Sequence, residues 1–257
     1  MDKDLNGRVQ SVDRAMTILE ALEHAEGGQR LTDLARTTKL SLTTVHRLLT
    51  TLEQRHFVQF SSSDNLWHIG RGAFVVGSAF TREKHFIAAA LPYLRRLRDR
   101  THETANLGMA DESEIVLVNQ IQSREINRSI SAIGGRTPMF ASGMGKAVLA
   151  SYPQDDVRAV VQRSGMRRVT AKTITTPKDL DDQLGRIKLD GFSVDDEEYR
   201  LGVRCVAAPV FDSRGEVVCA ISVSGTPARM PTERVGTIGQ MVKEVAGELS
   251  RAIGAAI

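Results

Sequence analysis

The stretch SGMGKA, which begins at Ser142, contains residue types whose spacing suits the binding of a small anion. Ser142 is placed to cap a helix that begins at Gly143, because its side-chain oxygen can accept a hydrogen bond from an amide of the first turn. The amides of Gly143 and Met144 at that positive helix end would attract a carboxylate. The stretch is not a phosphate-binding loop, since no Gly lies five positions before Gly145 and Ala147 replaces the hydroxyl that would contact Mg²⁺. It therefore favours a small carboxylic acid as ligand.

A second group of candidate ligand-binding residues lies on two apolar segments nearer the C-terminus. Ser222 and Ser224 alternate along one segment, so both hydroxyls would project from the same face of a strand, and Cys205 lies on the other segment. Together they could line a small polar cavity. The alternative is that the serines fill an edge strand and Cys205 is a small core residue. Asp195 opens the acidic run DDEE, a pattern that more often forms a solvated turn than a site.

The placement of histidines argues against catalysis in the C-terminal half. All six lie at or before His102, so residues 103–257 contain none. A Ser-His-Asp or Cys-His arrangement, or a histidine-based metal site, cannot be built from that segment alone. We therefore expect no catalytic residues, no metal and no cofactor. An enzyme that uses Cys205 is the remote alternative.

A predicted pair of helices in residues 31–57 carries a different chemistry. Its apolar residues recur with the spacing of two helices that each bury one stripe, and the corner between them falls at Lys39. The polar face of the second helix has hydroxyls, an imidazole and a guanidinium, which suit phosphate oxygens and base edges in a major groove. An ordinary amphipathic helix pair is the alternative. The residues expected on this DNA-binding face are Ser41, Leu42, Thr43, Thr44, His46, Arg47 and Thr50.

The segments around the helix pair complete a predicted winged helix-turn-helix over residues 1–70. A preceding helix buries one face, which consists of Val12, Ala15, Ile18, Leu19 and Leu22. After the pair, FVQF and LWHIG read as two short strands joined by a polar loop. In that loop, Ser62 and Asn65 are placed to contact the DNA backbone beside the groove. Residues 71–84 are predicted to form a linker helix.

The remainder, residues 85–257, alternates between strand and helix patterns and predicts an α+β domain. An antiparallel sheet with helices around it would enclose a small molecule. Helices are predicted at 86–103, 143–152, 155–165, 177–191 and 231–254, with Pro92 kinking the first of these or marking a boundary. Strands are predicted at 104–111, 113–122, 125–133, 192–198, 204–212 and 216–225.

Length and composition are compatible with this two-domain organisation. The chain of 257 residues, 41% hydrophobic and 25% charged, is long enough for two domains that each bury a core. Its net charge of +3 does not by itself establish a nucleic-acid partner, but residues 27–60 have five basic and two acidic side chains, a local net of +3. There is no apolar signal core or membrane-spanning run, so we expect a cytoplasmic protein with its two cysteines reduced.

Several long motifs, in order, resemble the IclR family of bacterial transcriptional regulators. They are RVQSVDRAMTILEAL, LTDLARTTKLSLTTVHRLLTTLEQ, GGRTPMFASGMGKAVLA and GFSVDDEEYRLGVRCVAAPVFDSRGEVVCAISVSG. The resemblance extends from Val9 to about Leu249. It implies an N-terminal winged helix-turn-helix, a linker helix and a C-terminal effector-binding domain of GAF-like topology. It also implies a homodimer or homotetramer on double-stranded operator DNA.

The chain is similar to the branch of that family that regulates glyoxylate and acetate metabolism and senses small 2-oxo acids. Ser129 departs from the branch, which tends to have an aliphatic residue there, and its hydroxyl could admit a more polar or slightly larger acid. The implied effector-binding residues are Gly143, Met144, Asp195, Cys205, Ser222 and Ser224, with Ile126 and Ser129 on the apolar side.

We therefore expect a ligand-responsive repressor or activator of a catabolic operon. Glyoxylate is the first choice of effector and pyruvate the second. One alternative is a regulator of the same family that senses another carboxylic acid, such as an aromatic or sugar acid. Another is a DNA-binding scaffold whose second domain only oligomerises.

Overall fold

The computed structural model describes residues 9–25, 27–83, 85–123 and 132–256. The chain divides into two compact units, residues 1–84 and 85–257. Each unit has its own hydrophobic core. Among the described residues, no helix is both long and apolar enough to cross a membrane.

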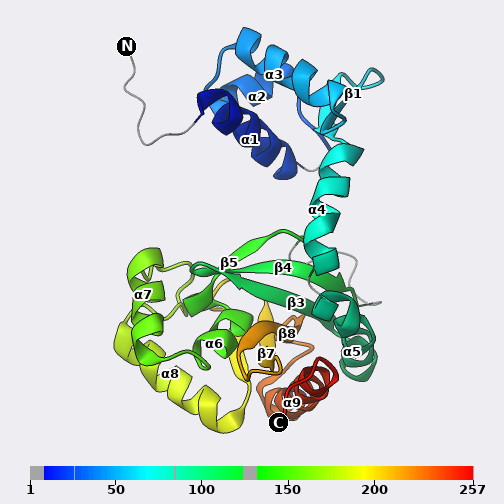
Figure 1. Cartoon of the computed structure of the whole chain (residues 1–257). Coiled ribbons are helices and arrows are strands. Elements are labelled where there is room, and N and C mark those ends of the chain that lie inside the picture. Colours follow the sequence, from blue (N-terminus) through cyan, green and yellow to red (C-terminus); the bar gives the residue numbers. More distant parts are fainter. Residues whose placement is uncertain (1–8, 26, 84, 124–131, 257) are drawn as a thin grey trace. The chain divides into compact units, whose positions relative to one another are not determined.

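The first unit is a winged helix-turn-helix, as predicted (Figure 1). Its elements are α1 (Gln10–Glu23), α2 (Leu31–Thr38), α3 (Leu42–Gln54), β1 (Val58–Ser61), β2 (Leu66–Ile69) and α4 (Arg71–Glu83). Strands β1 and β2 pair antiparallel. The buried core of this unit includes Ile18, Leu34, Val45, Leu49 and Trp67. The apolar spacing of the sequence therefore identified the three helices and the hairpin that hold the recognition face.

Two local features of this unit bear on the predictions. Lys39 has φ 56°, a left-handed conformation that a non-glycine residue adopts at a cost of about 1 kcal/mol, and it ends α2 at the predicted corner. The prediction that Val12 lies on the buried face of α1 is wrong, since Val12 is 58% exposed. The buried residues of α1 begin only at Ile18, because the core of this small unit does not extend to the first turn.

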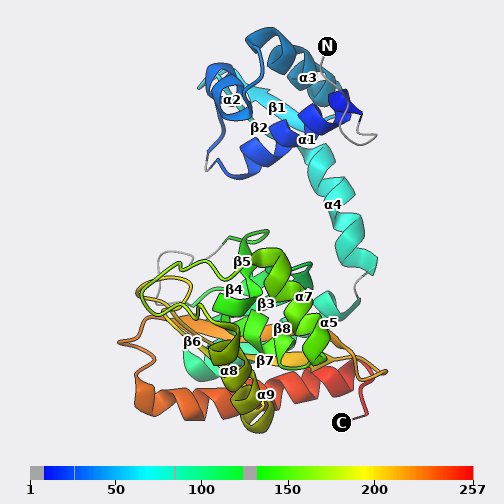
Figure 2. The same cartoon turned by 90° about the vertical axis from the view of Figure 1, so that its left-hand side faces the viewer.

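The second unit is built on a six-stranded antiparallel sheet in the order β5-β4-β3-β8-β7-β6 (Figure 2). The strands are β3 (Thr104–Asp111), β4 (Glu114–Ile121), β5 (Arg136–Pro138), β6 (Ser193–Asp196), β7 (Arg204–Phe211) and β8 (Val217–Gly225). The hairpins β3-β4 and β7-β8 were both predicted. Strand β8 lies between β3 and β7, so the alternative that Ser222 and Ser224 fill an edge strand is wrong.

Two layers of helices cover the sheet. α5 (His85–Thr101) and α9 (Thr232–Ala252) pack on one face, while α6 (Gly143–Leu149), α7 (Gln154–Ser164) and α8 (Pro177–Asp190) pack on the other (Figures 1 and 2). A 3₁₀ turn, η1 (Met139–Ala141), precedes α6. The expected α+β architecture is therefore confirmed.

Two local predictions concern Pro92 and residues 125–133. Pro92 lies inside α5 and does not end it. Most of the strand predicted at 125–133 falls outside the described residues. The structure also shows β5, which the sequence did not predict, because this edge strand of three residues includes Pro138 and is too short to produce an alternating pattern.

Candidate functional site

A cavity of about 60 Å³ lies in the second unit, between the sheet and the first turn of α6. A volume of this kind has room for roughly four to six water-sized groups. Its polar lining comprises Asn106, Gln120, Thr137, Ser142, Asp195, Tyr199, Arg200, Cys205 and Ser224, and its other lining residues include Ile115, Leu117, Gly143 and Met144. Of the predicted effector-binding residues, Gly143, Met144, Asp195, Cys205 and Ser224 therefore lie together.

The remaining three predicted residues are placed differently. Ser222 is fully buried and does not line the cavity. Ile126 and Ser129 lie outside the described residues.

An amide side chain on β3 joins the two serines of β8. Asn106 lies opposite Ser222 in the β3-β8 pair, and its Nδ2 donates to Ser222 Oγ at 3.2 Å and Ser224 Oγ at 3.1 Å. Gln120 Nε2 on β4 donates to Asn106 Oδ1 at 2.9 Å. Cys205 on β7 is the register partner of Ser224. Ser222 therefore acts behind the cavity wall, where it holds Asn106 in place.

The first turn of α6 has the cap that the sequence predicted. Ser142 Oγ accepts a hydrogen bond from the amide of Gly145 at 3.0 Å. A Cβ on Gly143 would lie 3.0 Å from Cys205 Sγ, so glycine lets this turn pack directly on β7. The first amides of a helix have no intrahelical acceptor, and the residues that provide them here line the cavity.

The acidic run DDEE is only partly a solvated turn. Asp195 on β6 and Glu198 just after it are each only 5% exposed. The Glu198 amide donates to Asp195 Oδ1 at 2.7 Å. Asp196 and Glu197 fit the solvated interpretation, since they form ion pairs with the half-exposed Lys172 at 3.0 and 2.6 Å. One member of the run therefore reaches the cavity and another supports it.

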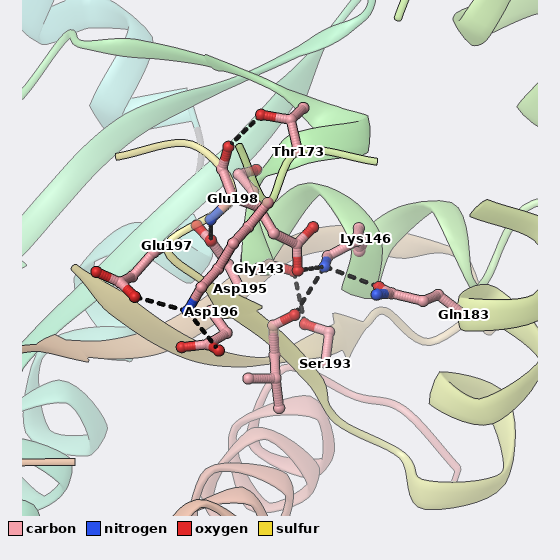
Figure 3. Close-up of polar contacts among 12 residues, drawn as sticks. Gly143, Lys146, Thr173, Gln183, Ser193, Asp195, Asp196, Glu197 and Glu198 are labelled. Atoms are coloured by element: carbon pink, nitrogen blue, oxygen red, sulfur yellow. Dashed lines mark hydrogen bonds and ion pairs between the residues drawn. The ribbon is translucent and has the colours of Figure 1, made fainter. Parts of the chain in front are cut away.

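Lys146 of α6 is a fully buried cation that faces this run (Figure 3), and the buried Arg204 is a second, paired with Asp196 at 2.6 Å. Lys146 Nζ donates to Glu198 Oε1 at 2.5 Å, to Gln183 Oε1 at 2.8 Å and to the Val194 carbonyl at 2.7 Å. All three protons of the ammonium thus have acceptors. The bonds connect α6, α8, β6 and the acidic run beneath the cavity.

The surroundings of the cavity raise the pKa values of Asp195 and Cys205, so both groups stay protonated to a higher pH than usual. Burial, together with the charge of Glu198, raises the pKa of Asp195 to about 7. Burial and the charge of Asp195 raise the pKa of Cys205 to about 11, so its thiol is not ionised at neutral pH. A thiol in this state is a poor nucleophile, which argues against the alternative of an enzyme that uses Cys205. Among the described residues, no cluster of His, Cys, Asp and Glu could hold a metal ion.

Sequence reasoning missed several residues of the site. Asn106 and Gln120 line the cavity from segments that carry no distinctive motif, whereas Tyr199 and Arg200 directly follow the acidic run DDEE. Lys146 did leave a signal in the sequence, because it is the one charged residue in the otherwise apolar or glycine segment GMGKAVLA. A helix that is apolar all round is buried, and a lysine within it must have partners.

The first unit presents the predicted polar face on α3. Ser41 caps α3 by accepting from the Thr44 amide at 3.2 Å, and Leu42, Thr43, His46 and Arg47 are exposed. The face borders two hollows. One is shared with Ser11 and Arg14 of α1, and the other with Arg30, Asn65 and Trp67. Ser62 and Asn65 are exposed in the hairpin loop.

A winged helix-turn-helix with a polar recognition face, followed by an α+β unit that encloses a polar cavity, defines a DNA-binding transcriptional regulator with a sensor-type domain. The chain belongs to the IclR family. Residues 11–62 match the IclR helix-turn-helix domain, and residues 78–251 match the C-terminal domain of bacterial transcriptional regulators of the IclR type.

Known proteins similar to this chain support the assignment. The transcriptional repressor IclR of Escherichia coli (strain K12) is 39% identical over 250 residues, 96% of this chain and 91% of that protein. The acetate operon repressor of Salmonella typhimurium is 37% identical over 252 residues, 97% of this chain and 92% of that protein. The crystal structure of the Thermotoga maritima IclR superimposes with a TM-score of 0.80 at 26% identity, covering 96% of this chain and 100% of that one. The name of the Salmonella protein gives the acetate operon as its target, in keeping with the branch that the sequence resembles.

Proposed function

We propose that this regulator represses a catabolic operon and responds to a small 2-oxo acid, with glyoxylate as the first choice and pyruvate as the second. The observation that carries the proposal is the size and lining of the cavity, which suits a few polar atoms. An aromatic or sugar acid would require the cavity to expand. The names of two similar proteins favour repression over activation.

The lining suggests how such an acid would bind. The amides of Gly143 and Met144 and the hydroxyl of Ser224 are donors that suit its carboxylate. Asp195, with a pKa of about 7, is partly protonated near neutrality and in that form can donate to the 2-oxo oxygen. Ile115 and Leu117 supply apolar contacts.

Calorimetry of both acids tests the pocket. We expect glyoxylate to bind the wild-type protein and Ser224→Ala to weaken binding about 2- to 10-fold, the effect of one lost hydrogen bond. Ser213→Ala is the matched control, because Ser213 is exposed in the turn between β7 and β8. Failure of either acid to bind, or unchanged binding by Ser224→Ala, contradicts the proposed site.

We propose that Arg47 reads a base in the major groove. Arg47→Ala should weaken binding to a promoter fragment by about 1–3 kcal/mol if the contact is bidentate. Fluorescence anisotropy gives the affinity, and circular dichroism shows that the variant is folded. Arg163→Ala removes the same charge from the exposed surface of α7 and should bind like the wild type. Equal affinity of the two variants would remove Arg47 from the recognition surface.

Coupling between acid binding and DNA binding requires an oligomer and a segment that connects the two domains. We propose a homodimer or homotetramer in which residues 1–70 read DNA, 71–84 link the domains and 85–257 bind the acid. Phe74, Val75 and Phe80 of α4 are exposed, which favours burial against a second copy. Two recognition helices must meet major-groove faces about 34 Å apart, so a shift in their spacing changes operator affinity.

A further inference from the structure

The second unit has another cavity, separate from the proposed effector pocket, with a volume of about 600 Å³. It opens beside the second half of β7. Strand β6 pairs with β7 only from Arg204 to Ala207, so Ala208–Phe211 has no strand partner on that side. Residues of α6, α8 and α9 complete its lining. We call this cavity the β7 groove.

The floor of the β7 groove is apolar and made largely of small residues. Small side chains leave the volume of the groove open, and Ile187 and Phe211 add larger apolar surface. The small residues are Ala147, Ala150, Ala208, Pro209, Ala246 and Gly247. A cavity of several hundred Å³ with an apolar lining is of the size that takes a whole organic ligand.

The rim of the groove is cationic. Lys188, Lys243 and Arg251 line it, and Glu244 is the one acidic residue among them. Glu244 forms an ion pair with Arg100 at 3.0 Å, so its charge is already compensated. Lys243 Nζ donates to the Asp190 carbonyl at 2.8 Å, which neutralises none of its charge. The positive rim over an apolar floor complements a molecule with an anionic head and an apolar body.

The exposed edge of β7 does not suit a peptide strand. Pro209 has no N–H, and the N–H of Phe211 donates to Ser250 Oγ at 3.0 Å. An added strand needs donors on alternate residues of the edge and would find neither of these. The groove therefore favours a small molecule over strand addition.

We propose that the β7 groove binds an amphiphilic monocarboxylic acid of the medium-chain alkyl type. The chain lies on the alanine, glycine and proline floor, and the carboxylate meets the cations of Lys188 and Arg251. Because Ala147 belongs to α6, whose first turn lines the effector pocket, and Ala150 directly follows that helix, a ligand here touches an element that both sites share.

Calorimetry with octanoate on the full chain tests the groove. Octanoate should bind with one site per chain, and octan-1-ol, which lacks the charge, should bind at least tenfold more weakly. Gly247→Leu fills the groove, since a Cβ there meets only Arg251 Nη1 at 3.6 Å, and it should weaken octanoate at least tenfold. Gly236→Leu is the matched control on α9, where a Cβ meets nothing within 4 Å, and should bind octanoate normally.

Further variants separate the groove from the effector pocket. Lys188→Gln with Arg251→Gln should weaken octanoate and leave glyoxylate binding unchanged, whereas Ser224→Ala should do the opposite. The proposal is overturned if octanoate does not bind, if Gly247→Leu binds it like the wild type, or if glyoxylate displaces it competitively. It is also overturned if Gly247→Leu changes the sedimentation of the ligand-free protein, which would mean that a second copy covers the groove.

Discussion

At the scale of single residues, Lys146 connects the elements that lie beneath the effector pocket. A fully buried ammonium is unfavourable unless it is paired and hydrogen-bonded, and Lys146 has one carboxylate and two neutral acceptors. Burial raises the pKa of Glu198, and the Lys146 charge opposes that rise. Removing either partner leaves the other as an unpaired buried charge.

The Lys146 pair can be tested by a double-mutant cycle. Lys146→Met should lower the free energy of unfolding by about 3–5 kcal/mol, because it leaves the Glu198 carboxylate buried without its cation. Lys146→Met with Glu198→Gln should recover part of that loss, since no unpaired charge remains. Urea denaturation measures the wild type, Lys146→Met, the single variant Glu198→Gln and the double variant. A single variant within about 1 kcal/mol of wild type would show that the pair is not important for stability.

Asp195 should make effector binding depend on pH. The pKa of Asp195 in the folded protein is about 7, above the usual 3.8, so the folded protein favours the protonated carboxyl. The contribution of that proton to the stability of the fold is complete below pH 3.8 and is lost as the pH rises through 7. The groups around Asp195 are Glu198, Lys146, Cys205 and the cavity residue Arg200. A bound carboxylate adds negative charge and raises the pKa of Asp195 further, so binding takes up a proton above that pH.

The pH dependence can be measured directly. The Kd for glyoxylate should rise by up to about tenfold per pH unit above neutrality. Asp195→Asn, which cannot ionise, should give a flatter profile. If the wild-type Kd does not change with pH, or both proteins show the same slope, Asp195 does not couple binding to a proton.

At the scale of secondary-structure elements, α6 is the helix that links the pocket to the core. A Cβ on Gly145 would lie 2.3 Å from backbone atoms of Met139, so only glycine allows α6 to pack against the preceding turn. Gly145→Ala should lower the free energy of unfolding by about 1–3 kcal/mol through overpacking. Gly185→Ala on α8, where a Cβ meets nothing within 4 Å, should raise it by about 0.5–1 kcal/mol. Thermal or urea unfolding compares the two, and equal stability would contradict the packing argument.

The elements also show what the sequence could and could not predict. Periodicity identified the helices and the long strands, and residue type identified the caps at Ser41 and Ser142, because these are local signals. The position of β8 inside the sheet was not local, since it depends on pairing with β3 more than a hundred residues earlier. The same long-range pairing brings Asn106 to Ser222 and Ser224. No local motif could therefore predict that Asn106 belongs to the site.

At the scale of the whole molecule, the proposal is that two separate units influence each other. Thermodynamic linkage requires that if the acid changes operator affinity by some factor, the operator changes acid affinity by the same factor. Such couplings typically amount to about 1–3 kcal/mol. Operator affinity measured with and without saturating glyoxylate gives the first factor, and calorimetry of glyoxylate with and without a saturating operator duplex gives the second. We expect the two factors to agree and Ser224→Ala to shift the midpoint of the glyoxylate titration without changing the limit reached at saturation. If operator affinity does not depend on the acid, acid binding and DNA binding are not coupled. That result would contradict the regulatory role of the cavity.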